Sequence, residues 1–394
     1  SHNRKEILGC NCMKYIKNAK LVLENGIIWD GVLVTDGDRI ADCGHASEIS
    51  IPNGAEIIDA EGKYVGPGFV DIHVHGGDVY SFYEQPLEAA HHFLKNGETT
   101  ILGALYYDLS REQFLASIGI IQEAMKQPGA GQALKGFYME GPYMNPKYGA
   151  RADLNKWKGE IRKEDYKDLV DAAGKDAKVW AVAPEREGIN DFMQYARSVN
   201  PDVMFSVGHS EATPAQIRKC KRLGLGLQTH CMDATGRNAL WSGTRGCGPD
   251  EACFLDSDMY AEIISDSGAV HVNADLQRLI VKNKSVDRVV LITDSFVSFE
   301  ESPEGLRHLS DLVFDPNSNL NGSKLTMSVA ARNIMTHTNC GITQAFLMAS
   351  RNPARVIGMD DEIGTIEPGK RADLVFVDDM MNVSRVMIGG EFYQ

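Results

Sequence analysis

Eight short apolar runs, each bounded by polar residues, recur along the middle of the chain and constrain its fold more than any other feature. Buried strands that alternate with helices over such a length are typical of an α/β fold, the (β/α)8 TIM barrel. An open doubly wound sheet is the alternative, but no GxGxxG or Walker sequence supports it. Amphipathic segments lie between most of the runs, for example at 87–96, 111–126, 164–173, 214–223 and 274–284. The runs themselves are residues 65–74, 99–105, 134–139, 179–183, 203–207, 226–229, 261–265 and 289–293.

Both ends of the chain have a different character from this middle part. Residues 14–65 alternate between apolar and polar positions and are punctuated by turn sequences such as Asn25-Gly26, which predicts short strands. Two further strands are predicted near the carboxyl end, at 374–378 and 385–388. Neither end can bury much apolar surface alone, so we expect them to pair. The predicted domains are a small β-domain, residues 13–65 plus 359–394, and a barrel, residues 66–358.

Polar residues that can carry chemistry follow the apolar runs, at the points where the runs end. In a barrel the carboxyl ends of the strands converge on one mouth, so residues far apart in sequence become neighbours there. His73 and His75 project from the same side of one strand, because side chains alternate along a strand. The other strand-end residues are Glu140, His209, His230 and Asp294.

Taken singly, each of these residues has an ordinary structural explanation. His209 or His230 could be a core histidine with satisfied hydrogen bonds, and Glu140 could be a solvated loop residue. Together, two histidines and a carboxylate form a ligand set suited to Zn²⁺ or Fe²⁺ with an open coordination position. The sequence therefore predicts one or two divalent metal ions at the mouth of the barrel.

Asp294 and His271 are the candidates for contact with the reacting groups. Asp294 could cap a strand or form a salt bridge. Beside a water activated by a metal, its carboxylate could instead accept and return a proton as a general base. His271 lies in the seventh loop, where it either reaches the substrate or has a structural role.

Charge and hydropathy exclude some classes of partner. The chain has 40 Lys and Arg against 54 Asp and Glu, a net charge of −14, which argues against a nucleic-acid partner. No run of 18 apolar residues is present, so we expect no membrane span. The first residues lack the apolar core of a signal peptide, and eight cysteines are scattered along the chain. These features predict a cytoplasmic protein with reduced thiols.

Several ordered motifs carry a resemblance to a known family. They include PGFVDIHVHGG (67–77), MEGPYMNPKYGA (139–150), VGHSEAT (207–213), LITD (291–294) and IGTIEPGKRADLVFVD (363–378). With these motifs the chain resembles the amidohydrolase superfamily, and within it the N-acetylglucosamine-6-phosphate deacetylases. The resemblance implies a metal-dependent barrel with a small β-sandwich built from both termini. It also implies hydrolysis of the N-acetyl group of an amino-sugar phosphate.

The resemblance also implies roles for individual residues, matched by position. Glu140, His209 and His230 match the principal metal ligands, and His73 and His75 match a second site. Asp294 matches the catalytic aspartate. The residues that match substrate contacts are His271, the loop Leu320-Asn321-Gly322, and Arg245, which falls where the family has an arginine that reaches a neighbouring subunit's phosphate.

Two positions depart from the family pattern at the substrate end. Arg151 stands where the family usually has a histidine that polarises the amide carbonyl. Asp233, followed by Ala234, stands where it usually has an asparagine that contacts the sugar phosphate. A carboxylate near a phosphate is repulsive unless a cation pairs with it, and Arg151 or Arg237 is the candidate cation.

The function expected from these observations is a metal-dependent deacetylase that releases acetate from an N-acetylated amino-sugar phosphate. One alternative is a related amidohydrolase acting on an unphosphorylated N-acyl amino sugar or a cyclic amide. Another is a barrel that binds metal or sugar without catalysis. The expected partner is a small molecule, with no nucleic acid and no membrane. If Arg245 acts on a neighbouring subunit, the protein is at least a dimer, and we expect a homodimer.

Overall fold

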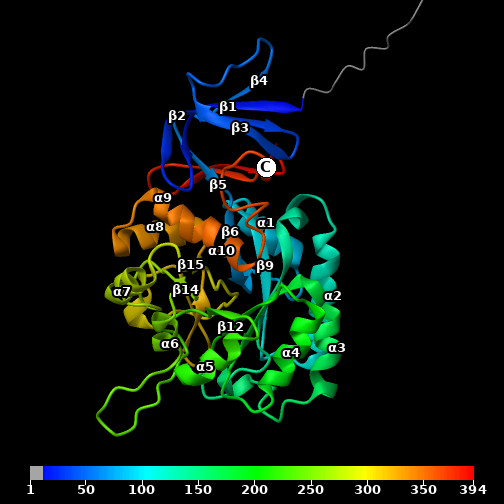
Figure 1. Ribbon diagram of the computed structural model, residues 1–394, viewed down its shortest axis with the longest axis vertical. Helices are drawn as coiled ribbons and strands as arrows, with labels where there is room; N and C mark the ends of the chain where they lie inside the picture. The colour runs from blue at the N-terminus through cyan, green and yellow to red at the C-terminus, as the bar shows by residue number, and fades with distance from the viewer. Residues whose placement is uncertain (1–11) are drawn as a thin grey trace, which may run out of the picture.

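The computed structural model describes residues 12–394 and contains a parallel eight-stranded barrel (Figure 1). Neighbouring strands pair in parallel in the order β15-β14-β13-β12-β11-β10-β9-β6. The ring closes where the amide of Asp294, just after β15, donates to the carbonyl of His73 in β6 at 2.9 Å. The strands are β6 (Phe69–Val74), β9 (Glu98–Tyr106), β10 (Leu134–Glu140), β11 (Ala177–Val182), β12 (Met204–Val207), β13 (Leu225–Gln228), β14 (Tyr260–Ile264) and β15 (Val289–Ile292). The predicted TIM barrel is confirmed.

Helices surround the barrel, and each of the five segments predicted from amphipathic spacing is helical (Figure 1). Two of these helices begin at capping boxes: the Ser110 hydroxyl accepts from the Gln113 amide, and the Thr213 hydroxyl accepts from the Gln216 amide, both at 3.2 Å. The helices are α1 (Pro86–Leu94), α2 (Arg111–Met125), α3 (Lys163–Ala173), α4 (Ile189–Val199), α5 (Pro214–Lys221), α6 (Pro249–Leu255), α7 (Ala274–Lys284), α8 (Met327–Thr338), α9 (Ile342–Phe346) and α10 (Asn352–Val356).

The first apolar run is divided between two sheets. β5 (Tyr64–Pro67) pairs with strands of the terminal sheet, and only β6 enters the barrel. Gly68 lies between the two, and no larger residue fits there, because a Cβ atom at this position would lie 1.9 Å from the hydroxyl oxygen of Thr99. The expectation of one strand over 65–74 was therefore wrong, since uninterrupted hydrophobicity does not reveal where a strand changes sheets.

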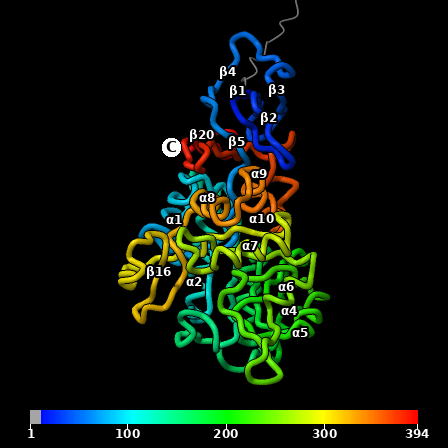
Figure 2. Tube along the Cα trace, turned by 90° about the vertical axis from the view of Figure 1, so that its left-hand side faces the viewer, coloured from blue at the N-terminus to red at the C-terminus, as the bar shows by residue number. Residues whose placement is uncertain are grey.

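A separate sheet is built from both ends of the chain, as predicted (Figure 2). β5 pairs antiparallel with β18, so that Pro67 lies opposite Leu374. The apolar core of this sheet combines Ile16 and Leu33 from the first part of the chain with Leu374 and Met387 from the last. Its strands are β1 (Met13–Val22), β2 (Ile27–Asp36), β3 (Arg39–His45), β4 (Glu56–Asp59), β5, β18 (Leu374–Val377), β19 (Val383–Ile388) and β20 (Glu391–Phe392). The domain boundaries near residues 65 and 359 stay a prediction.

Two excursions from the barrel bear on the site. The hairpin of β16 (Leu312–Phe314) and β17 (Leu320–Ser323) follows β15, and Ser323 forms an isolated bridge with Ser295. The segment between β13 and α6 protrudes from the molecule as a long loop, at the lower left of Figure 1, and carries the exposed side chains of Leu240 and Trp241. Within the part of the chain that the structure describes, no helix has the length and apolar character to cross a membrane.

Candidate metal centre and substrate cavity

Six strand-end side chains meet at the carboxyl end of the barrel, with Glu140 at their centre. Its Oε2 lies 3.2 Å from Nε2 of both His209 and His230, and 3.3 Å from Nε2 of His73. Its Oε1 lies 3.1 Å from Nε2 of His75. The structure thus brings together residues at or just after the ends of β6, β10, β12 and β13, as the barrel prediction required.

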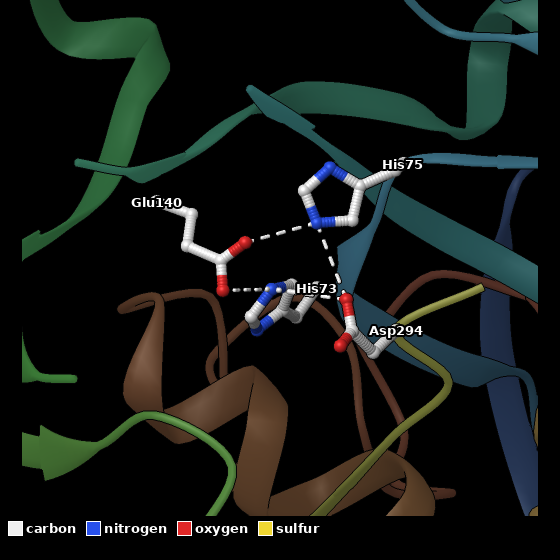
Figure 3. A group of neighbouring side chains, drawn as sticks. All are labelled: His73, His75, Glu140 and Asp294. Atoms are coloured by element: carbon white, nitrogen blue, oxygen red, sulfur yellow. Dashed lines mark ion pairs between the residues drawn. The ribbon is translucent and has the colours of Figure 1, made fainter. Parts of the chain in front are cut away.

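These side chains form two overlapping groups with the spacing of metal ligands. Within each group, one ligand atom per residue lies within 4.8 Å of all the others. Figure 3 shows the first group, in which Asp294 Oδ1 lies 3.2 Å from His75 Nε2 and 3.4 Å from His73 Nε2. Glu140 belongs to both groups. The first group is His73, His75, Glu140 and Asp294, and the second is Glu140, His209 and His230.

Each of the four imidazoles faces Glu140 with Nε2 and contacts a further protein group with Nδ1. His73 Nδ1 lies 2.9 Å from a carboxylate oxygen of Glu262, and His75 Nδ1 lies 2.8 Å from the hydroxyl of Tyr83. His209 and His230 use backbone carbonyls in the same way, those of Tyr148 and Asp233. All four Nε2 atoms are therefore directed at Glu140. Such outer contacts fix the ring orientation and the tautomer of metal-binding histidines.

Glu262 was not assigned a role from the sequence, although a signal for it exists. It is the third of the five residues of β14, inside an apolar run, and is completely buried. A buried carboxylate must meet a hydrogen-bond donor or a positive charge. Besides His73, it accepts the backbone amide of His230 at 3.1 Å. Glu262 thus connects both ligand groups.

The electrostatics of the cluster suit a cation. Burial alone would raise the pKa of Glu140, but the surrounding histidines, His73 first, hold it well below its usual range. Burial also opposes protonation of His73, and the neighbouring carboxylates Glu140 and Glu262 outweigh it and raise the pKa of the imidazole. His73 Nε2 is buried without a hydrogen-bond partner of suitable geometry. Imidazoles and carboxylates are ligands that divalent transition metals accept, and such an ion would supply the positive charge that the carboxylates otherwise draw from protonated imidazoles, so these residues fit it.

A cavity of about 240 Å³ opens beside the cluster. Its wall includes His75, Glu140, His209, His230 and Asp294 on the side of the metal ligands. No lysine or arginine is among the described residues that line it. Six predicted substrate contacts line the cavity as well: Asp233, Ala234, His271, Leu320, Asn321 and Gly322.

Two polar atoms in this wall have no hydrogen-bond partner among residues 12–394. His271 Nδ1 lies 3.0 Å from a carboxylate oxygen of Asp266, which leaves His271 Nε2 buried and unpaired. Asp233 Oδ2 is also buried and unpaired. Burial raises the pKa of Asp233 to about 7, although the nearby imidazole of His271 acts in the opposite direction. Both atoms are available to a ligand in the cavity.

The two predicted arginine contacts lie elsewhere in the structure. Arg151 does not line the cavity: its Nε lies 3.8 Å from carboxylate oxygens of Asp153 and Asp315, while the backbone of Gly149 and Ala150 borders the cavity in its place. The Arg245 side chain is 71% exposed on the protruding loop, and its Nη2 lies 3.9 Å from Glu251. Within one described chain, neither guanidinium meets the cavity.

Comparisons with known proteins agree with this architecture. A curated N-acetylgalactosamine-6-phosphate deacetylase from Escherichia coli O157:H7 is 29% identical to the chain, covering 95% of this chain and 98% of that protein. An N-acetylglucosamine-6-phosphate deacetylase from Vibrio furnissii is 27% identical and covers 93% of this chain and 88% of its own.

Solved structures give the same picture at the level of the fold. The N-acetylglucosamine-6-phosphate deacetylase from Pasteurella multocida superposes with a TM-score of 0.82 at 24% identity, over 96% of this chain and 99% of that one. The deacetylase of the same name from Thermotoga maritima gives 0.78 at 25% identity, with coverage of 96% and 99%. A model of the amidohydrolase family matches residues 64–392, from the last strand before the barrel to the final strand of the terminal sheet. The chain therefore belongs to the amidohydrolase family.

Proposed function

We propose that the protein is a metal-dependent deacetylase that hydrolyses the N-acetyl group of an amino-sugar phosphate, giving acetate and the free amino-sugar phosphate. The observation that carries this proposal is the cluster of four imidazoles around Glu140, with Asp294 beside it, at the edge of a cavity. The relatives that match nearly the whole chain are named as deacetylases of N-acetylglucosamine-6-phosphate or N-acetylgalactosamine-6-phosphate.

Glu140, His209 and His230 would hold one divalent ion, and His73, His75 and Asp294 would hold a second together with Glu140. Zn²⁺ or Fe²⁺ is the proposed metal, because the ligand set mixes imidazole with carboxylate. A divalent ion in such a site supplies Lewis acidity toward a water molecule and toward an amide carbonyl.

Asp294 is the proposed general base and acid. Burial would raise the pKa of Asp294, but the neighbouring imidazoles of His73 and His75 hold it below its usual value, which favours the carboxylate form that can accept a proton. It takes the proton of a water whose oxygen bonds to the acetamide carbon. It then returns this proton to the amine nitrogen as the carbon–nitrogen bond breaks. Acetate and the amine result.

The substrate end of the cavity is proposed to recognise the sugar through Asp233, Ala234, His271 and the 320–322 segment. The lining supplies no lysine or arginine for a phosphate, so Arg245 of a second subunit is the proposed cationic contact, and a homodimer follows from it. The guanidinium of Arg151 lies near Asp315 and not in the cavity wall. Its contact with the amide carbonyl of the substrate therefore stays a prediction. A cytoplasmic location also stays a prediction.

Acetate release from four compounds tests the proposal: N-acetylglucosamine and N-acetylgalactosamine, each with and without a 6-phosphate. We expect the phosphorylated sugars to be hydrolysed with a much higher kcat/KM. The second candidate is an amidohydrolase of unphosphorylated N-acyl sugars, which the carboxylate of Asp233 and the lack of a lining cation favour. Preferential hydrolysis of the unphosphorylated pair would support that candidate. No acetate from any of the four, with metal bound, would reject both.

A further inference from the structure

The turn of residues 230–235, which follows β13, carries parts of both halves of the site. His230 at its start is one of the imidazoles around Glu140, and Asp233 and Ala234 in its middle line the cavity. Three residues of this turn that are not glycine have positive φ angles: His230 with φ 21°, Met232 with φ 69° and Ala234 with φ 54°. Such conformations are costly and persist only where surrounding contacts hold them.

Asp250, near the start of α6, provides those contacts. Asp250 is buried, with 6% of the residue exposed, and its carboxylate accepts hydrogen bonds from residues on both sides of the turn. Oδ1 accepts from Gln228 Nε2 at 2.5 Å and from the amide of Met232 at 2.9 Å. Oδ2 accepts from the hydroxyl of Thr235 at 2.9 Å. One carboxylate therefore joins the end of β13, the middle of the turn and its last residue.

The metal-binding end of the turn is held by a different group. The amide of His230 donates to the side chain of Glu262 at 3.1 Å, and the amide of Cys231 donates to the backbone carbonyl of Glu262 at 2.8 Å. β14 thus fixes His230, whereas α6 fixes the part of the turn that presents Asp233 and Ala234. The two ends of the turn are linked by His230 Nδ1, which lies 3.2 Å from the carbonyl oxygen of Asp233, so bound metal has to be measured alongside substrate binding.

We propose that Asp250 is a positioning residue for the substrate end of the cavity, acting through the backbone of the 230–235 turn. This inference rests on the proposed function only for its kinetic consequence. A prearranged wall binds a ligand without the cost of ordering it first, so loss of the contacts weakens binding more than it slows the chemical step.

The test compares Asp250→Ala and Asp250→Asn with a control, Asp258→Ala, which removes an exposed carboxylate just beyond the same helix. The asparagine variant keeps an oxygen that accepts from Gln228 and Met232, and its amide can donate to the Thr235 hydroxyl. We measure kcat and KM for acetate release from a phosphorylated N-acetyl amino sugar, bound metal by elemental analysis, and deuterium exchange of the amides of residues 231–235.

We expect Asp250→Ala to raise KM at least about tenfold with a smaller change in kcat. Bound metal should be unchanged and exchange of the turn amides faster. Asp250→Asn should have a KM close to that of the parent protein, and Asp258→Ala should resemble the parent protein in all three measurements. The exchange measurement applies even if no sugar phosphate is hydrolysed, so failure of the proposed function and failure of this inference are distinguishable. Unchanged exchange in Asp250→Ala would overturn the inference, as would loss of metal in parallel with activity.

Discussion

At the scale of single residues, Asp294 is the side chain on which the proposed chemistry depends most directly. Its Oδ1 lies within 3.4 Å of two imidazole nitrogens, and its backbone amide closes the barrel ring onto β6. An asparagine keeps this shape but cannot accept and return a proton. We therefore expect Asp294→Asn to lower kcat at least about 100-fold, the scale of general acid–base catalysis, while the protein stays folded.

Steady-state acetate release, circular dichroism and metal analysis check this expectation. Asp258→Asn, which changes an exposed carboxylate to an amide, is the matched control and should leave kcat unchanged. Near-normal turnover by Asp294→Asn would remove this residue from the proton-transfer role.

Strand-end positions made the central residues predictable from the sequence. His73, His75, Glu140, His209 and His230 lie at or just after the ends of regular strands, and barrel geometry alone brings such positions together. Arg151 lies in a loop after β10, where neither strand period nor helix period fixes the direction of a side chain. Asp250 acts from a helix on a turn, a relation that no spacing in the sequence reveals.

At the scale of elements, the β16–β17 hairpin and β15 approach each other closely at one point. Gly322 has φ +83°, and a Cβ atom there would lie 2.5 Å from the backbone carbonyl oxygen of Asp294. We expect Gly322→Ala to displace β17 from the cavity wall, lowering kcat/KM and the melting temperature together. Kinetics and a thermal melt measure both effects.

The control for this prediction is Gly305→Ala, in the same connection after β15. A Cβ atom at Gly305 would meet nothing within 4 Å, and no left-handed conformation is required there. This variant should behave as the parent protein. If both alanine variants have parental kcat/KM, the hairpin does not form part of a working cavity wall.

Element boundaries were harder to predict than element types. All eight barrel strands overlap the apolar runs, because strands of a parallel sheet are buried on both faces and are therefore hydrophobic along their length. The same continuity concealed the break at Gly68, where β5 and β6 separate into different sheets. The partners that define the break, β18 for β5 and β9 for β6, come from other parts of the sequence, as does Thr99, whose close approach requires a glycine at this point.

At the scale of the whole molecule, the candidate metal ligands connect strands from most of the barrel circumference. They lie at or just after the ends of β6, β10, β12, β13 and β15, so a bound ion joins segments that are otherwise linked through neighbouring strands. An ion that binds only the folded state stabilises it. We expect a chelator to abolish activity and lower the melting temperature, and added Zn²⁺ or Fe²⁺ to restore both.

Thermal melts with and without chelator, alongside elemental analysis, provide the measurement. Glu140→Gln removes the carboxylate shared by both ligand groups, so its melting temperature should no longer respond to the chelator. Full activity in protein shown to contain no metal would contradict the metal-dependent mechanism.

The pairing of β5 with β18 has a consequence for how this protein is made. Pro67 and Leu374 are opposite one another, and the entire barrel lies between them in the chain. Contacts between such distant segments form slowly, since a very long loop must close first. During synthesis, β5 has no partner on this edge until the ribosome has passed residue 374. The barrel can therefore assemble while its neighbouring sheet still presents an open edge, which makes the growing chain most prone to misassociation just before its last strands emerge.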